Sequence, residues 1–251
     1  MRFPSISLAL GALAFAGTSL LHAGSEADAA VSLRSDPSSS GDIPIGIEAV
    51  TGYRSEYVYR GFMLGRHVID FQLEAEIVLT DSLVLSAGGW YATEASGGDF
   101  SEADGFLDLR YEWDHWALGV AATYRSYTHT FFEDGLDTGL FLIWSPNDDI
   151  QITAGGYYDD GPGGWYGKLE ANWSHPLGDK SFVAALAGLS WVDDYYRRNG
   201  ANDAYARLSW TYVFNDRVSV TPFVGTSVST DSGQASGDNY LWGGLWFEVN
   251  F

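Results

Sequence analysis

The sequence predicts an all-β protein: a closed antiparallel up-and-down barrel of about twelve membrane-spanning strands. Three observations carry this prediction. Apolar and polar side chains alternate from Ile45 to Phe251, short and long connections alternate along the chain, and aromatic residues gather at segment ends on the apolar face. Because a strand turns successive side chains to opposite faces, such alternation gives each strand one oily and one polar surface.

The clearest alternation runs from Ile69 to Leu79, where apolar residues occupy every second position and Asp70, Gln72 and Glu74 lie between them. The first segment follows the same rule from Ile45, and it predicts an apolar face that includes Tyr57 and Tyr59. Its predicted polar face carries Glu48, Arg54, Glu56 and Arg60. Ten further strands are predicted near 83–92, 105–113, 116–127, 136–144, 150–158, 165–174, 181–192, 203–214, 217–228 and 239–251. Pro222 has no amide hydrogen to donate, which predicts disturbed pairing at that point.

The predicted connections alternate in length along the chain. The short ones lie at 80–82, 114–115, 145–149, 176–180 and 215–216. The longer acidic, Gly-rich ones lie at 93–104, 128–135, 159–164, 193–202 and 229–238, and a shorter connection on the same side lies at 61–66. Short periplasmic turns alternating with longer external loops are typical of outer-membrane barrels. This arrangement predicts an even strand number, external long loops and two periplasmic termini.

Aromatic residues on the predicted lipid face form two groups, as expected of rings that favour the two boundaries of a bilayer. Beside the short turns or at the C-terminus lie Trp113, Trp116, Trp144, Trp173, Tyr212 and Phe251. Beside the long connections lie Tyr57, Tyr59, Tyr91, Tyr124, Tyr158, Trp165 and Trp191.

The N-terminal 44 residues differ from the rest of the chain. Residues 1–23 have the pattern of a secretory signal peptide, with Arg2 before an apolar stretch and a small-residue cleavage site at Ala23. Residues 24–44 are small and polar and predict a flexible periplasmic tail, so the barrel is expected over 45–251. No stretch after residue 23 has the roughly 18 continuous apolar residues of a spanning helix.

Composition excludes several classes of protein. The formal net charge is −20, which excludes a nucleic-acid partner. The sequence has no Cys, so neither a lipoprotein anchor nor a disulfide framework is expected. We expect no cofactor and no metal site.

Two motifs resemble known bacterial barrels. The apolar-faced segment that ends at Phe251 resembles the last strand of outer-membrane barrels, in which the terminal aromatic is part of the signal read by the barrel-assembly machinery. The stretch 55–61, Ser-Glu-Tyr-Val-Tyr-Arg-Gly, resembles the first-strand motif of the TorF-like putative porin family of Gram-negative bacteria, with Glu56 in place of the usual Asp. The resemblance to this family is strong over about 20 residues in all. Outside the quoted stretch, Gln72 is similar to a glutamine of that family's second strand. The resemblance implies an outer-membrane location and a channel-like barrel.

The inward-facing charges are the candidate functional residues, because they would orient a polar solute in the lumen. They are Arg54, Glu56, Arg60, Asp70, Glu74, Arg110, Arg125, Lys168, Glu170 and Arg207. The same inward face also carries Glu76, Asp108, Glu112 and Asp137. With these four included, acidic residues exceed basic ones on that face, which predicts a modest cation preference. Eight glycines on the lumen side favour an open interior: Gly52, Gly88, Gly119, Gly139, Gly155, Gly188, Gly225 and Gly244.

Two functional interpretations follow from this lumen. In the first, a porin-like channel passes small polar solutes by passive diffusion through the outer membrane. In the second, the charges pair with one another and fill a closed structural or anchoring barrel. Twelve strands lie between small barrels with filled interiors and open 16-stranded porins, so strand number allows both. Outer-membrane lipid and lipopolysaccharide are the expected surroundings.

An outer-membrane lipid hydrolase is a third, less favoured interpretation, since such enzymes also use twelve strands. It requires a Ser and a His paired on the lipid-facing side with a third polar group to orient the His. His67 and His129 lie near predicted external loops without that pattern, and His115 and His175 lie at predicted periplasmic turns. No catalytic residue is therefore predicted.

Overall fold

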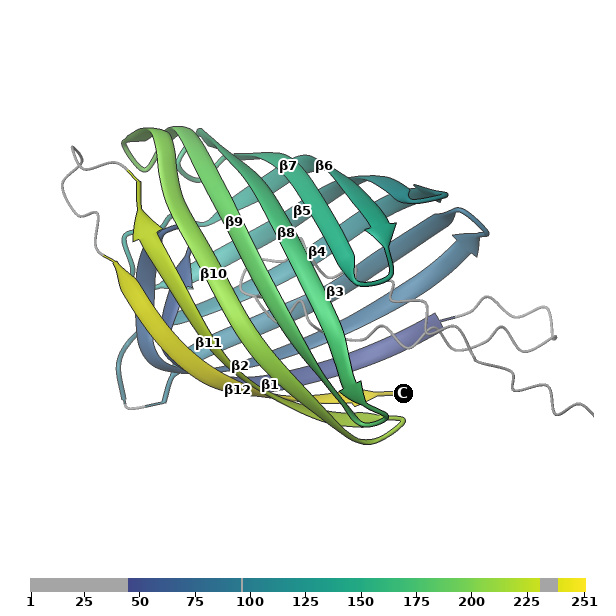
Figure 1. Ribbon diagram of the computed structural model, residues 1–251. Coiled ribbons are helices and arrows are strands. Elements are labelled where there is room, and N and C mark those ends of the chain that lie inside the picture. Colours follow the sequence, from purple (N-terminus) through teal and green to yellow (C-terminus); the bar gives the residue numbers. More distant parts are fainter. Residues whose placement is uncertain (1–44, 96, 231–238) are drawn as a thin grey trace, which may run out of the picture.

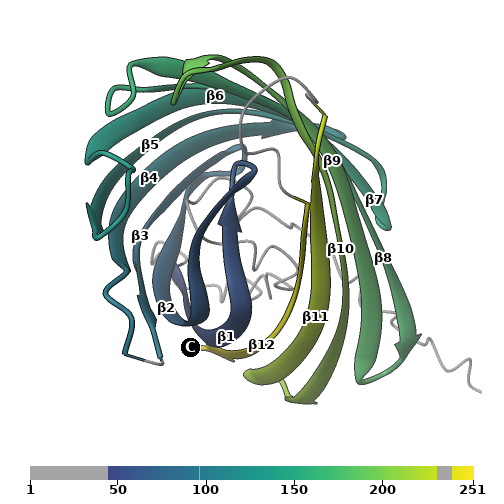
Figure 2. The same cartoon turned by 90° about the vertical axis from the view of Figure 1, so that its left-hand side faces the viewer.

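The computed structural model describes residues 45–95, 97–230 and 239–251, and these form a closed barrel of twelve antiparallel strands (Figure 1). Each strand pairs with its neighbours in the sequence, and β1 pairs with β12 to close the ring (Figure 2). The predicted fold class is therefore confirmed. Among the described residues, no helix has the length and apolar character needed to cross a membrane. The predicted signal peptide and tail, 1–44, lie outside the described residues.

The strands run as β1 Ile45–Tyr59, β2 Phe62–Thr80, β3 Leu83–Glu94, β4 Ser101–Trp113, β5 Trp116–Thr128, β6 Gly135–Asn147, β7 Ile150–Asp159, β8 Gly164–Gly178, β9 Ser181–Tyr195, β10 Arg198–Asn215, β11 Val218–Ser229 and β12 Tyr240–Asn250. Ile45 and Phe251 lie at the same end of the barrel as five two-residue connections, 81–82, 114–115, 148–149, 179–180 and 216–217. We call this the turn end. The opposite end, which holds the other connections, is the loop end.

Several strands extend further toward the loop end than the sequence predicted. β2 begins at Phe62 instead of 69, β4 at Ser101 instead of 105, and β10 at Arg198 instead of 203. The connections there shrink accordingly to 60–61, 95–100, 129–134, 160–163 and 196–197, while 230–239 falls mostly outside the described residues. Acidic residues such as Glu102 suggested loops, but they occupy lumen-facing strand positions instead.

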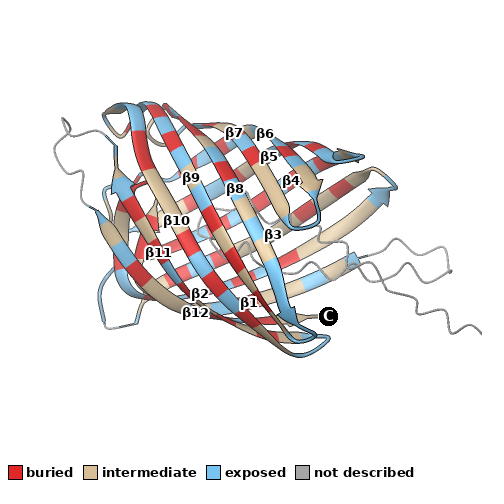
Figure 3. Ribbon diagram, in the orientation of Figure 1, coloured by how far each residue is buried: buried red, intermediate tan, exposed pale blue. Residues whose placement is uncertain are grey.

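Side-chain exposure alternates along most strands, as Figure 3 shows in the bands of buried and exposed residues. Leu107 and Leu140 are 50% and 60% exposed, whereas the neighbouring Asp108 and Phe141 are buried. The two predicted aromatic groups largely face outward as well. Exposed on this surface are Trp113, Trp116, Trp144, Trp173 and Phe251 toward the turn end, and Tyr91, Tyr124, Tyr158, Trp165 and Trp191 toward the loop end. A wide apolar exterior around a polar interior is the pattern of a barrel that sits in lipid.

Pairing around Pro222 is disturbed on one side only. The ladder to β12 continues, with Pro222 opposite Leu245. The ladder to β10 passes from the pair Ser209–Phe223 directly to the pair Tyr212–Val220. The missing backbone pairing is bridged by a hydrogen bond of 2.9 Å between the hydroxyls of Thr211 and Thr221. The expected disturbance is therefore present and is compensated locally.

The lumen glycines do not leave space, contrary to the sequence-based expectation. Seven of the eight lie directly opposite an aromatic residue of a neighbouring strand, whose ring covers the position that a Cβ would take. The pairs are Gly52–Trp246, Gly88–Phe106, Gly119–Phe141, Gly139–Tyr157, Gly188–Tyr205, Gly225–Trp242 and Gly244–Phe223. The eighth, Gly155, is covered by Tyr157 of its own strand. Inward-facing aromatic rings pack directly over these glycines, and the rings fill part of the lumen.

This packing predicts a difference between two glycine substitutions. Gly119→Ala places a methyl group against the Phe141 ring, and we expect it to lower the free energy of unfolding by about 1–3 kcal/mol, as overpacking does. The control is Gly105→Ala, because nothing lies within 4 Å of a Cβ added there. Urea unfolding in lipid vesicles, followed by tryptophan fluorescence, measures both. Equal losses of unfolding free energy in the two variants would contradict the requirement for glycine under the Phe141 ring.

Candidate functional site: a hairpin folded into the lumen

The loop end of the β1–β2 hairpin leaves the barrel wall. The β1–β12 ladder ends at the pair Arg54–Gly244, and the β2–β3 ladder ends at the pair Val68–Glu94. In the ladder, residues 55–66 then pair only with one another. Figure 2, which looks onto the loop end, shows this hairpin standing inside the ring of the other strands. We call residues 55–66 the inner hairpin.

A tight turn closes the inner hairpin. Arg60 and Gly61 have φ angles of 49° and 76°, so both central residues are left-handed, as in a type I′ turn. The twist of that turn matches the twist of paired strands, and it lets the hairpin stay narrow. Arg60 and Gly61 are the last two residues of the stretch that resembles the porin first-strand motif. The connection predicted at 61–66 is therefore a two-residue turn at 60–61, and β2 starts immediately after it.

Two backbone irregularities mark this region. His67 has a positive φ of 53°, and the register shifts between Tyr57 and Val58. Tyr57 is completely buried instead of facing lipid, and Tyr59 packs with it in the interior. The carboxylate of Glu56 lies 3.9 Å from the guanidinium of Arg66, a side chain that is 64% exposed. Tyr57 and Tyr59 therefore do not face lipid, and Glu56 lies in a more exposed part of the hairpin than the buried lumen charges.

Both faces of the inner hairpin are covered by the barrel wall. On one face, the Tyr57 ring lies 5.5 Å from the Trp90 ring and 5.8 Å from the Phe100 ring. On the other face, Val58 belongs to an apolar cluster with Trp242, against which Met63 packs. A strand pair in the wall would have one face in lipid. The burial of both faces places this hairpin inside the barrel.

The side chain of Arg60 crosses to the opposite wall, where two carboxylates receive it. Its Nη2 pairs with Asp137 Oδ2 of β6, and its Nη1 lies 3.7 Å from Asp159 Oδ2 of β7. Nη1 also donates to the hydroxyl of Tyr195 at 3.1 Å, and that hydroxyl donates to Asp159 at 3.2 Å. Only 6% of the Arg60 side chain is exposed. The charge-assisted hydrogen bond to Asp137, the hydrogen bond to Tyr195 and the longer ion pair with Asp159 together hold the hairpin tip.

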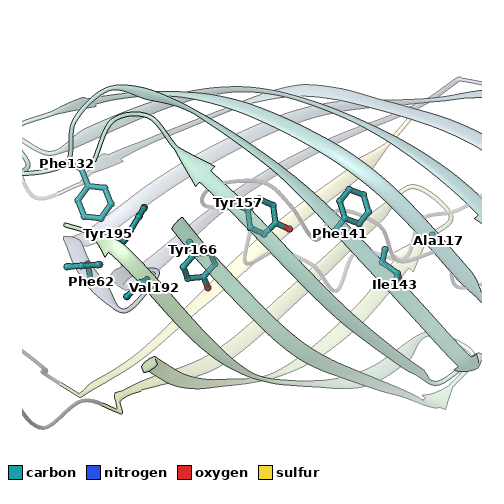
Figure 4. Close-up of a cluster of buried hydrophobic side chains, with 9 residues drawn as sticks. All are labelled: Phe62, Ala117, Phe132, Phe141, Ile143, Tyr157, Tyr166, Val192 and Tyr195. Carbon is teal, nitrogen blue, oxygen red and sulfur yellow. The ribbon is translucent and has the colours of Figure 1, made fainter. Parts of the chain in front are cut away.

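Four tyrosine rings surround the same guanidinium. Its central carbon lies 4.3 Å from the centre of the Tyr166 ring, and the rings of Tyr59, Tyr195 and Tyr157 follow at 5.0, 5.3 and 5.7 Å. Figure 4 shows Tyr157, Tyr166 and Tyr195 in sequence along the interior. An aromatic face within about 6 Å attracts a cation through its quadrupole. We call Asp137, Asp159 and these four tyrosines the guanidinium cage.

The tip is also held by Phe132 of the 129–134 connection and by Arg198 and Asn202 of β10. Phe62 packs against Phe132 at 5.4 Å and lies under the guanidinium of Arg198 at 3.5 Å. Arg198 Nη1 donates to the carbonyl of Gly61 at 3.2 Å, and Asn202 Nδ2 donates to the carbonyl of Arg60 at 2.9 Å. These contacts satisfy the backbone carbonyls of the turn, which the barrel ladder does not reach.

Most of the predicted lumen charges do face inward, and they pair. The pairs and contacts are Arg54 with Asp70 at 2.5 Å, Arg110 with Glu112 at 2.6 Å and Glu76 at 3.2 Å, Arg125 with Asp137 at 2.9 Å, Lys168 with Glu170, Gln72 with Glu74 at 3.1 Å, and Arg207 over the Trp246 ring at 5.1 Å. They do not form one ring at a single height. Instead, each of these basic groups is held close to its own strand, and only Arg60 reaches across the lumen. This pairing matches the salt-bridged interior of the second interpretation.

The structure adds residues that the sequence-based candidates do not include. Asp159, Tyr195 and Asn202 lie in or beside stretches that the sequence analysis assigned to loops. The same holds for Glu102 and Asp104, which are buried on β4. Their signal was the alternation from Glu102 through Asp104 to Phe106, which continues the pattern of the following strand residues. Across the described residues, ten carboxylates and four arginines are buried as whole residues, and the side chain of Arg60, 6% exposed, adds a fifth arginine. No group of three or more potential metal ligands occurs in that same part of the chain.

Three comparisons place this geometry among known proteins. No family model matches the chain, and no curated protein matches its sequence. Solved structures do match. The barrel is similar to an outer-membrane channel from Pseudomonas putida F1 (TM-score 0.55, 9% identity, 86% of this chain and 100% of that one). It is also similar to the KdgM porin (0.53, 9%, 82% and 99%) and the NanC porin (0.53, 12%, 82% and 98%). The shared feature is the fold.

The clamp on the hairpin tip leads to a prediction about local stability. Phe62→Ala removes the ring that Phe132 and Arg198 hold, and the loss of such a buried ring costs about 3–5 kcal/mol. We expect faster amide hydrogen exchange in residues 55–66 and unchanged exchange in the wall strands. Arg66→Ala, which changes an exposed side chain of the same hairpin, is the control. Uniformly faster exchange around the whole barrel would contradict a separately held hairpin.

Proposed function

We propose that this protein is an outer-membrane channel for the passive diffusion of small polar solutes, and that the inner hairpin is its gate. The observation that carries the proposal is the separation between wall and hairpin. The wall closes through the β1–β12 ladder, whereas residues 55–66 lie in the interior and are not part of the wall. An element that blocks the lumen but is not part of the wall can move without opening the barrel. The likeness to solved channels supplies the fold on which such a path is built.

The orientation follows from the same proposal. The loop end would face the outside of the cell and the turn end the periplasm, as short turns do in barrels of this kind. Outer-membrane lipid and lipopolysaccharide would surround the apolar exterior. Phe251 would be the residue that the barrel-assembly machinery reads, in line with the resemblance of the last strand. The TorF-like relationship itself stays a prediction from residues 55–61.

The interior charge supports a preference for cations. The excess of buried carboxylates over buried arginines gives the lumen a negative potential, which attracts cations and repels anions. We therefore expect neutral and cationic solutes to pass more readily than acidic solutes. The selectivity would be modest, because many of the carboxylates are paired with arginine or lysine.

A closed structural barrel is the second candidate, and the paired lumen charges favour it. The two candidates differ in whether the hairpin ever leaves the interior. We therefore expect single-channel recordings in planar bilayers to show rare, brief openings of the wild-type protein. Phe62→Ala should open at least about tenfold more often, since roughly 1.4 kcal/mol of lost clamp energy suffices for that factor. Arg66→Ala should behave like the wild type. Silence of all three folded proteins would favour the closed barrel.

Ion selectivity supplies an independent measurement. In a KCl gradient, the reversal potential of the open Phe62→Ala channel should have the sign of K⁺ over Cl⁻ permeation. Glu74→Gln in that background removes one buried lumen charge and should move the reversal potential toward zero. Asp148→Asn, at a turn between β6 and β7, is the matched control outside the lumen. Anion preference in the open channel would reject the charge argument.

A further inference from the structure

Arg60 occupies its cage in the way that a bound ligand occupies a site. Its guanidinium meets two carboxylates, Asp137 and Asp159, and a hydroxyl from Tyr195, all of which come from the wall. The ring of Tyr166 lies under it at 4.3 Å. Apart from Tyr59, every member of the guanidinium cage belongs to strands that remain in place if the hairpin moves. The cage is therefore a wall feature, and Arg60 is its tethered occupant.

The chemistry of the cage is general for organic cations. Carboxylates accept hydrogen bonds from guanidinium and ammonium groups, and tyrosine faces attract the same groups through their quadrupoles. A planar guanidinium fits best, because it donates in the plane and stacks through its face. Asp137 also pairs with Arg125 at 2.9 Å, and so the two carboxylates carry only a small excess of negative charge once Arg60 leaves. That excess suits a singly charged cation.

We propose that the guanidinium cage is a binding site for a solute that carries a guanidinium or primary ammonium group, and that Arg60 is a tethered competitor for it. This inference rests on the proposed channel function and names the solute class and the trigger of the gate. When such a solute takes the cage, Arg60 loses its partners on the opposite wall, and the hairpin is held by its remaining contacts alone. The gate is thus released when the solute cation replaces the guanidinium of Arg60 in the cage.

The exchange has a concentration threshold. Arg60 is joined to the wall by a short hairpin, and a short tether gives an effective concentration of about a millimolar or more. A free cation of similar intrinsic affinity must exceed that value at the external mouth in order to displace it. Removal of Arg60 abolishes the competitor and leaves the wall part of the cage intact. Binding of a small guanidinium should then become much easier to detect.

The first experiment measures binding without any conductance. Methylguanidinium is titrated calorimetrically into detergent-folded Arg60→Ala, with Arg60→Gln as a second variant should the first fail to insert. We expect millimolar binding in these variants and at least about tenfold weaker binding in the wild type, because the tether competes. Urea, a neutral group of similar shape, should not bind at the same concentrations. Adding Asp159→Asn to Arg60→Ala should weaken binding, whereas adding Arg66→Ala should not.

The second experiment measures gating in planar bilayers. Methylguanidinium added on the external side should raise the open probability of the wild type several-fold, and the Asp159→Asn protein should lose that response. Folded Arg60 variants that fail to bind methylguanidinium would overturn the inference, even if the protein conducts. Binding by these variants with no conductance from any protein would support the cage and reject the channel. Equal responses to methylguanidinium and urea would also overturn the inference, since the cage selects charge.

Discussion

The structure depends on the complete pairing of the barrel backbone. In hydrocarbon, each backbone amide or carbonyl without a partner costs several kcal/mol, so only a closed ladder is stable there. The β1–β12 ladder provides the closure, from the pair Glu48–Asn250 to the pair Arg54–Gly244. That closure extends only part of the way along β1. Beyond Arg54 the remaining segment of β1 pairs only with β2, and the two strands lie together inside the barrel.

The interior imposes a different requirement on the same residues. Charges that are removed from water must be paired, because the desolvation penalty of an isolated ion is large. The wall meets this requirement locally, with Arg54 beside Asp70 and Arg110 between Glu76 and Glu112. Arg60 meets it only by reaching across the lumen to Asp137 and Asp159. Arg60 is therefore paired with Asp137 and Asp159 only while the inner hairpin lies in the lumen.

The alternation of apolar and polar residues allowed much of the fold to be predicted from the sequence. It allowed less of the candidate site to be predicted. Strict alternation from Ile69 to Leu79 identified β2, and the short turns gave the strand number. The strand ends were missed because a wet lumen accepts the same acidic residues that loops do, as at Glu102. The hairpin was missed because Tyr57 keeps the period of Ile45, and alternation alone does not show whether an apolar face meets lipid or the inner wall of the barrel. The glycines misled for another reason: which ring covers Gly119 is decided by register with β6, and composition does not reveal register.

The nature of the contacts explains why a plug of this kind suits a gate better than a part of the wall does. An apolar plug is released only when its surface meets water, and no solute in the aqueous phase offers a specific substitute for that contact. An ion pair differs, because a dissolved cation can replace one partner and leave the other satisfied. At the tip of the inner hairpin Phe62 makes the apolar contacts, among them those with Phe132 and Tyr195, whereas Arg60 makes the charged contacts across the lumen. Exchange of a tethered cation for a free one would thus cost little, and the barrel wall need not change while it occurs.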